Sequence, residues 1–518
     1  LQMLRTGRLC LSSMLRRQFA TAKGPLEVTK VPLDEPLPGF EKWTADSSTA
    51  PSSSGSAFSS RVSQLETGLR VATQPCHGEF VTIGVAIESG SRYEAEYTKG
   101  TSHLLEKLAF GETTKRSVDE FFTIMDQSQA IVDCQITKDL TIYAASCHRS
   151  GVAAILELLA DSALRPKLND EEVEVARQVL QHEENDMRTR IESIEPIVTD
   201  YLHSAAFRGN TLGFSRFTPI ENIPKISRKE LFAFLRAHHN PARMVVAGVG
   251  VDHEEFSSLV QRHFVPVETN GTNRPIDSSI SQYTGGEQRM EWDLSVVGQG
   301  TPYPLLAHVV LGFQSCGYKD EDFVPFSVLQ SLLGGGNSFS AGGPGKGMYT
   351  RMYTDVLNHH HWMYGCTTYN HTYADNGVFA LHASGPPKSI DVALSIVLHQ
   401  FLRLPEGFDQ DEFNRAKAQL KSQLLMNLET RPVMFEDLAR QVIGHGRRKL
   451  PEEYMAEIDK VQPKDLVRVA ERMLHSRPSL VGYGKLDQLQ SYEKLDDAVG
   501  KRDLALLKKR APYFSFKK

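Results

Sequence analysis

Residues 103–107 read His-Leu-Leu-Glu-Lys and differ by one residue from a metal-binding pattern. When His-x-x-Glu-His lies on a helix, the two histidines are four residues apart on one face and can both bind zinc, while the glutamate activates the metal-bound water. In this chain Lys107 stands where the second histidine would be. Its ammonium group, with a reference pKa of about 10.4, has no lone pair to donate at neutral pH. The sequence therefore predicts a degenerate motif, with His103 and Glu106 as remnants and no bound metal.

A third zinc ligand would come from a later helix, where inverted zinc peptidases supply a glutamate. The segment VLQHEENDMR offers Glu183 and Glu184 at a suitable separation from Lys107. The alternative interpretation is an acidic helix face in contact with solvent. The other histidine groups, at 238–239 and 359–361, lack ligand spacing, so we expect no metal there.

The segment 334–347 reads GGGNSFSAGGPGKG, and its glycine density excludes a helix or a central strand. It is not a phosphate-binding loop, because no Gly-Lys pair in it is followed by serine or threonine. One alternative is a flexible surface loop without a specific role. Its place between two expected helices, where the other half of the chain has no such insert, favours a lid or binding loop.

We therefore predict a lid or binding loop over this segment, and we assign no catalytic residue. The candidate substrate-binding residues are Gly334, Gly335, Gly336, Asn337, Ser338, Phe339, Ser340, Ala341, Gly342, Gly343, Pro344, Gly345, Lys346 and Gly347.

The elements that must position these residues come from an internal repeat. Four segments recur in the same order: 81–94 with 308–322, 151–164 with 390–404, 170–180 with 410–420, and 223–250 with 458–484. Each half opens with strand-like residues and continues with paired helical patterns. The sequence predicts an α+β fold of two homologous domains, each a largely antiparallel sheet with helices packed on one face. A doubly wound nucleotide-binding fold is disfavoured, because no GxGxxG follows a first strand.

The expected boundaries follow from composition. Residues 1–26 contain no acidic residue and carry several arginines, which is typical of a mitochondrial presequence; a basic tail is the alternative. We expect a presequence over 1–19, a flexible Ser/Gly/Pro-rich linker over 20–60, domains over 61–265 and 301–518, and a polar connector over 266–300. Removal of residues 1–19 takes away four arginines and no acid, so the formal charge moves from −5 to −9.

The remaining composition excludes several classes of protein. The 518 residues are 23% charged and 40% hydrophobic, which indicates a globular chain, and no apolar run is long enough for a transmembrane segment. The small net charge gives no field that favours nucleic acid. Six cysteines without CxxC spacing indicate free thiols rather than a disulfide framework.

Several segments resemble one branch of peptidases. They are HLLEKLAF at 103–110, YTGGE at 283–287, NLETRPVMFEDLARQV at 427–442, and the glycine-rich segment together with the helix and strand residues that follow it. From about residue 32 to the C-terminus the chain resembles the α subunits of the mitochondrial processing peptidases, heterodimeric relatives of the pitrilysin/insulysin family.

The resemblance implies a non-catalytic subunit that recognises cationic presequence peptides through its glycine-rich loop. It also implies a β subunit as partner, with zinc bound in that partner and none in this chain, and a place in the mitochondrial matrix or on the matrix side of the inner membrane. Candidate acidic contacts for a cationic peptide are Asp320, Glu321, Asp322, Glu183, Glu184 and Asp186.

Two other functions stay open. A core structural subunit of respiratory complex III is one, because those proteins resemble the same family, and one chain can serve both roles. Retention of the glycine-rich loop favours processing. An independent zinc peptidase is the other, and Lys107 argues against it.

Overall fold

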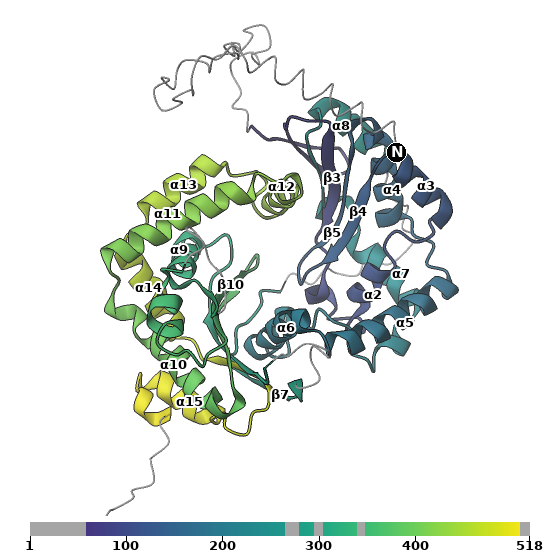
Figure 1. Ribbon diagram of the computed structural model, residues 1–518. Coiled ribbons are helices and arrows are strands. Elements are labelled where there is room, and N and C mark those ends of the chain that lie inside the picture. Colours follow the sequence, from purple (N-terminus) through teal and green to yellow (C-terminus); the bar gives the residue numbers. More distant parts are fainter. Residues whose placement is uncertain (1–58, 265–278, 295–303, 339–347, 508–518) are drawn as a thin grey trace, which may run out of the picture. The chain divides into compact units, whose positions relative to one another are not determined.

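The computed structural model describes residues 59–264, 279–294, 304–338 and 348–507. All of them belong to one compact unit, residues 57–518 (Figure 1). The expected presequence, most of the linker and the C-terminal tail lie outside the described residues.

The first sheet is built from the first half of the chain. Its strand order is β1 (Arg61–Gln64), β2 (Arg70–Gln74), β6 (Met244–Val249), β3 (Phe80–Ile87), β5 (Thr141–His148) and β4 (Ile131–Ile136). Every pair is antiparallel except β2 with β6. Alternate residues of β3, among them Val81, Ile83 and Val85, point to the helices α3 (Val118–Gln127), α4 (Val152–Leu164) and α8 (His253–His263) and are fully buried against them.

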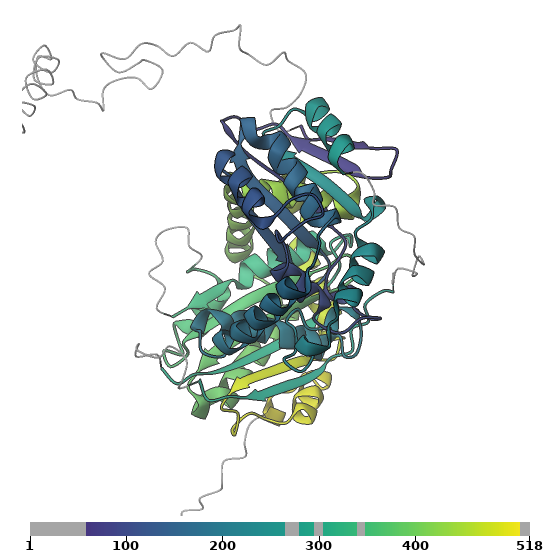
Figure 2. The same ribbon diagram turned by 90° about the vertical axis from the view of Figure 1, so that its right-hand side faces the viewer.

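The second sheet repeats this arrangement. Its order is β7 (Gly286–Glu291), β12 (Ser479–Gly484), β8 (Ala307–Gln314), β11 (Gly377–Gly385), β10 (Gly365–Thr372) and β9 (Gly335–Asn337), and only β7 and β12 run parallel. Helices α9 (Phe323–Leu333), α10 (Ile390–Leu402), α14 (Pro463–Leu474) and α15 (Tyr492–Gly500) pack on one face. Figure 2 shows β12, in yellow, beside the teal strands of the same sheet, although the sequence separates them widely.

The helices form where local sequence favours them. In α14, proline occupies the first position, and Leu466, Val469, Ala470 and Met473 place one apolar stripe on the core. Further helices are α5 (Asp170–Met187), α7 (Arg228–His238), α11 (Gln410–Asn427) and α13 (Pro451–Lys460). The short helix α2 (Thr101–Lys107) carries the degenerate motif, and Met352–Leu357 is a π-helical turn.

The two sheets confirm the predicted fold class and the repeat. Ala176 of α5 and Ala416 of α11, paired in the sequence comparison, are both buried at the same place in equivalent helices. The expected connector over 266–300 is only partly a connection, because β7 lies inside it and forms the edge of the second sheet. Its polar sequence, Gly286–Glu291, is that of a half-exposed edge strand, which composition alone does not separate from a loop.

Each sheet is completed by a helix from the other half of the chain. Helix α12 (Arg431–His445) packs Phe435, Leu438 and Val442 on the second face of the first sheet, whereas α6 (Ile194–Ala206) packs Val198 and Leu202 on the second face of the second sheet (Figure 1). The strands leave room for these helices at Gly84 and Gly312. A Cβ atom at Gly84 would lie 2.6 Å from the Phe435 ring, and one at Gly312 would lie 3.0 Å from Leu202. The expectation of helices on one face therefore holds for the helices that pack on the sheet of their own half. The opposite face of each sheet is covered by a helix from the other half.

Polar contacts fix the exchange. The guanidinium of Arg70 on β2 donates to the Val442 carbonyl at the end of α12, at 3.0 Å. Arg92 forms a buried, bidentate ion pair with Asp375 of the second half, with N–O distances of 2.8 and 3.1 Å. A helix C-terminus carries partial negative charge, so the contact of the Arg70 guanidinium with the end of α12 is also electrostatically favourable.

Candidate functional site

The degenerate motif is held in place by a buried carboxylate at the start of α2. The carboxylate of Glu94 accepts hydrogen bonds from the backbone N–H groups of Gly100 and Ser102, each at 2.7 Å. Burial raises the pKa of Glu94 to about 7 even though these hydrogen bonds act in the opposite direction. Gly100 has φ of 101°, which a residue with a side chain adopts only with strain. The helix thus begins at a fixed point, and the motif side chains follow within two turns.

The ammonium group of Lys107 lies between two carboxylates. Its Nζ donates to Oε1 of Glu183 at 3.1 Å and lies 2.8 Å from Oε2, and it lies 3.3 Å from Oε1 of Glu106. Burial would raise the pKa of Glu183, but hydrogen bonds from His103 and Lys107 overcome that effect and lower it to about 2. The chain itself therefore supplies, through Lys107, a positive charge next to these two carboxylates.

His103 is oriented as a donor toward the same carboxylate. The backbone N–H of Thr218 donates to its Nδ1 at 3.2 Å, so in the neutral ring the proton resides on Nε2. That Nε2 faces Oε2 of Glu183 at 3.5 Å. A zinc-binding histidine needs a lone pair on the nitrogen that faces the metal, and this arrangement leaves a proton there.

These residues do not fit a zinc ion. Three donor groups are required, and here one position holds an ammonium and another a ring N–H. The second oxygen of Glu106 accepts from the backbone N–H of Ile136 on β4 at 3.0 Å, a structural contact. Over the residues that the structure describes, no group of three or more His, Cys, Asp or Glu side chains is arranged to hold a metal.

The structure separates the two acidic candidates on α5. Glu183 belongs to the motif cluster, whereas Glu184 turns away and pairs with Arg188 one turn further along the helix. Both side chains are only partly exposed, 31% for Glu183 and 24% for Glu184, and both are paired within the chain, so neither lies on a freely solvated acidic face.

Of the four other candidate acids, Glu321 is exposed and the remaining three are engaged within the chain. Asp186 pairs with Arg190 at 2.6 Å. Asp320 and Asp322 both contact Arg472, at 2.9 and 2.7 Å, and lie at the start of α9. Sequence reasoning missed these partners because the arginine of α14 lies about 150 residues away in the chain.

Only the start of the glycine-rich segment lies within the described residues. Gly335–Asn337 form β9, the outermost strand of the second sheet, antiparallel to β10. Gly335 has φ of 101°, and a Cβ there would lie 2.0 Å from the Cys366 carbonyl oxygen, so only glycine fits. Residues 339–347 lie outside the described residues, and their role stays a prediction.

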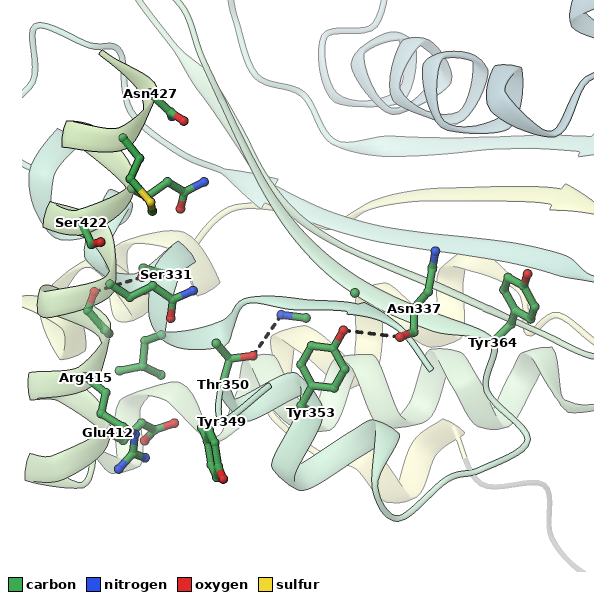
Figure 3. Close-up of a pocket in the computed structure, with 17 residues that line it drawn as sticks. Ser331, Asn337, Tyr349, Thr350, Tyr353, Tyr364, Glu412, Arg415, Ser422 and Asn427 are labelled. Carbon is green, nitrogen blue, oxygen red and sulfur yellow. Dashed lines mark hydrogen bonds between the residues drawn. The ribbon is translucent and has the colours of Figure 1, made fainter. Parts of the chain in front are cut away.

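A large cavity opens beside β9. It has a volume of about 950 Å³ and lies between β9, the segment 349–353 and one face of α11 (Figure 3). A second cavity of about 560 Å³ shares five of its lining residues. Glu412 is the one carboxylate among the described residues that line the first cavity, and Arg351 holds it through two N–O contacts of 2.9 and 2.7 Å. Sequence reasoning missed the α11 residues, although the repeat places Gln423 where α5 has Glu183.

No helix of the described part of the chain is long and apolar enough to cross a membrane. The two homologous halves, the exchanged helices and a degenerate inverted zinc motif define the class of protein. The family described as insulinase, peptidase family M16, matches residues 70–220, and the M16 inactive domain matches residues 225–420.

The chain is similar to proteins named mitochondrial-processing peptidase subunit alpha. It is 48% identical to that of Caenorhabditis elegans over 92% of this chain and 94% of the relative. It is 44% identical to that of Homo sapiens, over 91% and 90%, and 32% identical to that of Neurospora crassa, over 82% and 84%. The chain belongs to peptidase family M16 and, within it, to the group formed by these α subunits.

Proposed function

We propose that this chain is the non-catalytic, substrate-recognising α subunit of a heterodimeric mitochondrial processing peptidase, which removes presequences from imported precursors. The observation that carries the proposal is the Lys107 ammonium, which occupies the ligand position of the zinc motif and neutralises Glu183. A chain with this cluster cannot activate a metal-bound water by itself. Its relatives of 44 to 48% identity carry the name of an α subunit.

The proposal assigns the chemistry to a partner. A β subunit with an intact His-x-x-Glu-His motif would hold the zinc, and this chain would hold none. The relatives are named as mitochondrial proteins, and we place this chain in the matrix, where presequences are removed.

The proposed substrate is a cationic presequence. A chain with a formal charge of −9 after loss of residues 1–19 attracts such peptides over a distance. Residues 334–347 are the proposed contact segment, and β9 fixes where that segment leaves the sheet.

The test is reconstitution with the zinc-bearing subunit and a fluorescent presequence peptide. Glu106→Gln should leave the cleavage rate of the complex unchanged, because Glu106 contacts Lys107 and a backbone N–H rather than a metal. Deletion within 339–347 should raise KM at least tenfold. Full activity after the deletion would remove the loop from the proposal, and loss of activity in Glu106→Gln without loss of stability would place catalysis in this chain.

Native electrophoresis of mitochondria decides between this role and that of a complex III core subunit. Migration as a complex of about two such chains supports the proposal. Migration with the cytochromes alone would assign the chain to complex III.

A further inference from the structure

The cavity between β9 and α11 has a chemistry that the proposed recognition of cationic peptides does not explain. Its walls carry amide and hydroxyl groups, and its single carboxylate is already paired with Arg351. Among the described lining residues the other charged side chain is Arg415 (Figure 3), which is exposed and forms no ion pair with a described residue. Arg and Lys side chains of a presequence would therefore be repelled here.

One wall is a row of amide side chains on α11. Gln419, Gln423 and Asn427 follow one another at intervals of four residues, so they lie on one face of the helix. None of the three side-chain amides makes a hydrogen bond to a described residue. Amide groups both donate and accept, which is what a peptide backbone requires of its partner.

The spacing of this row matches an extended peptide. Four residues of helix rise about 6.0 Å, and two residues of an extended strand rise about 6.6 Å. Across the three amides the difference stays within about 2 Å, which side chains of this length accommodate. Every second peptide group of an extended segment could thus meet one amide of α11.

The opposite wall is the open edge of a sheet. Among the described residues β9 pairs only with β10, and no strand covers its other edge. On that edge the Gly335 N–H donates to the Thr350 hydroxyl at 3.1 Å and the Asn337 carbonyl accepts from the Tyr353 hydroxyl at 3.4 Å, and an added strand would replace these two contacts. Gly335 and Gly336 carry no side chains, but the Tyr353 hydroxyl lies against Gly336 and would have to move before a second backbone could approach closely. Strand addition at such an edge is a common mode of peptide recognition.

The repeat strengthens the contrast with the first half. Ala176 and Ala416 are equivalent, and counting seven residues further along each helix reaches Glu183 in α5 and Gln423 in α11. The first half has a charged cluster at this place, and the second half has a neutral amide above a cavity.

We infer that the β9–α11 cavity binds an uncharged, extended segment of the precursor peptide through its backbone, and that basic residues of the precursor bind elsewhere. Met426 and Tyr349, both exposed at the rim, offer apolar surface to side chains of that segment. The inference rests on the proposed function for the identity of the peptide, but the chemistry of the site does not depend on it.

The test is peptide binding to the purified full chain, followed by anisotropy of an uncharged fluorophore. The probe is an eight-residue peptide of Ala, Ser, Thr and Leu with both ends capped. Two relatives of the probe are compared with it: one is N-methylated at alternate residues, and one carries two arginines. We expect saturable binding of the neutral probe below about 1 mM, with at least tenfold weaker binding of both relatives.

The matched variants are Gln423→Leu with Asn427→Leu for the cavity and Asn414→Leu for an exposed position of α11 outside it. The cavity variant should weaken binding of the probe about tenfold, and the control should bind as the unaltered chain does. Circular dichroism checks that both remain folded.

The inference is overturned by lack of saturation, by equal binding of the N-methylated peptide, by tighter binding of the arginine peptide, or by undiminished binding to the cavity variant. The proposed function fails separately, if the chain does not restore presequence cleavage to the zinc-bearing subunit. Binding of the neutral probe without restored cleavage would leave the cavity assignment standing.

Discussion

Replacement of Lys107 by methionine tests whether its ammonium group stabilises the neighbouring carboxylates electrostatically, as a metal cation would. Methionine keeps an unbranched side chain of similar length and removes the charge. Glu183 and Glu106 would then face each other without the cation that now lies 2.8 and 3.3 Å from them. The expected result is a folded but less stable protein, because two partly buried carboxylates lose their common partner.

The size of the effect follows from the pKa of Glu183. That pKa is about 2, against about 4.3 for an unperturbed glutamate, and a difference of about two units corresponds to ~3 kcal/mol at neutral pH. Solvent screens part of this interaction, because 31% of the Glu183 side chain is exposed, and His103 provides part of the lowering. We therefore expect Lys107→Met to lower the free energy of unfolding by about 1 to 2 kcal/mol at pH 7.

The same pKa gives the pH dependence. Because the folded pKa lies below the unfolded value, the stabilisation is complete above about pH 5 and is lost as the pH falls toward 2. Urea unfolding at pH 7 and pH 4, followed by circular dichroism at low salt, should show a smaller difference between the variant and the unaltered protein at pH 4.

The matched control is Lys115→Met. Lys115 also contacts two acids, Glu157 and Asp161, each at 3.4 Å, but its side chain is 45% exposed and Arg116 pairs with the same acids. We expect it to cost less than about 0.5 kcal/mol. Equal losses in both variants, or a Lys107→Met protein as stable as the original at pH 7, would refute the reasoning.

Three further outcomes are expected. Lys107→His supplies the missing ligand, but the Thr218 N–H still binds Nδ1 of His103 and keeps a proton on the nitrogen that would face the metal, so calorimetric titration should show less than one zinc ion bound per chain. Stoichiometric binding would show that the lysine alone blocks the site. Leu438→Ala should lower the free energy of unfolding in urea by about 2 to 5 kcal/mol, because the side chain is fully buried between α12 and the first sheet. Val433, on the same helix, is 43% exposed, so Val433→Ala should lower it much less. Arg92→Met should cost about 1 to 3 kcal/mol, since Asp375, 17% exposed, would keep the hydrogen bond from the Ser281 N–H but lose the guanidinium. Adding Asp375→Asn should restore part of the loss, and no recovery in the double variant would contradict a paired-charge role.

The motif and the repeat could be predicted because they depend on local spacing. His103, Glu106 and Lys107 are within one helical turn of each other, and strand and helix periodicities recur in order along the two halves. Glu183 could be named as a candidate from its separation but not distinguished from Glu184, because two adjacent residues of a helix point in directions about 100° apart and only the packing of α5 on α2 selects one.

The exchange of α6 and α12 could not be predicted. Both helices have an apolar face that can pack on a sheet. Hydrophobic periodicity predicts that this face is buried, but it does not identify the sheet that buries it. The arginine partners of Asp320 and Asp322 could not be predicted for a related reason, since they come from a distant helix. The cavity beside β9 depends on where α11 passes, which is again a tertiary property.

The exchanged helices have a consequence for the order in which the chain can fold as it is made or threaded through a pore. The first sheet has all its strands once Val249 has emerged, yet its second face stays uncovered until α12, near residue 445, follows. For about 200 residues of synthesis at least one apolar sheet surface faces the surroundings, and such surfaces invite aggregation. Each half buries the helix-covered face of its sheet with its own residues, but the opposite face of either sheet would stay exposed if the two halves were separated.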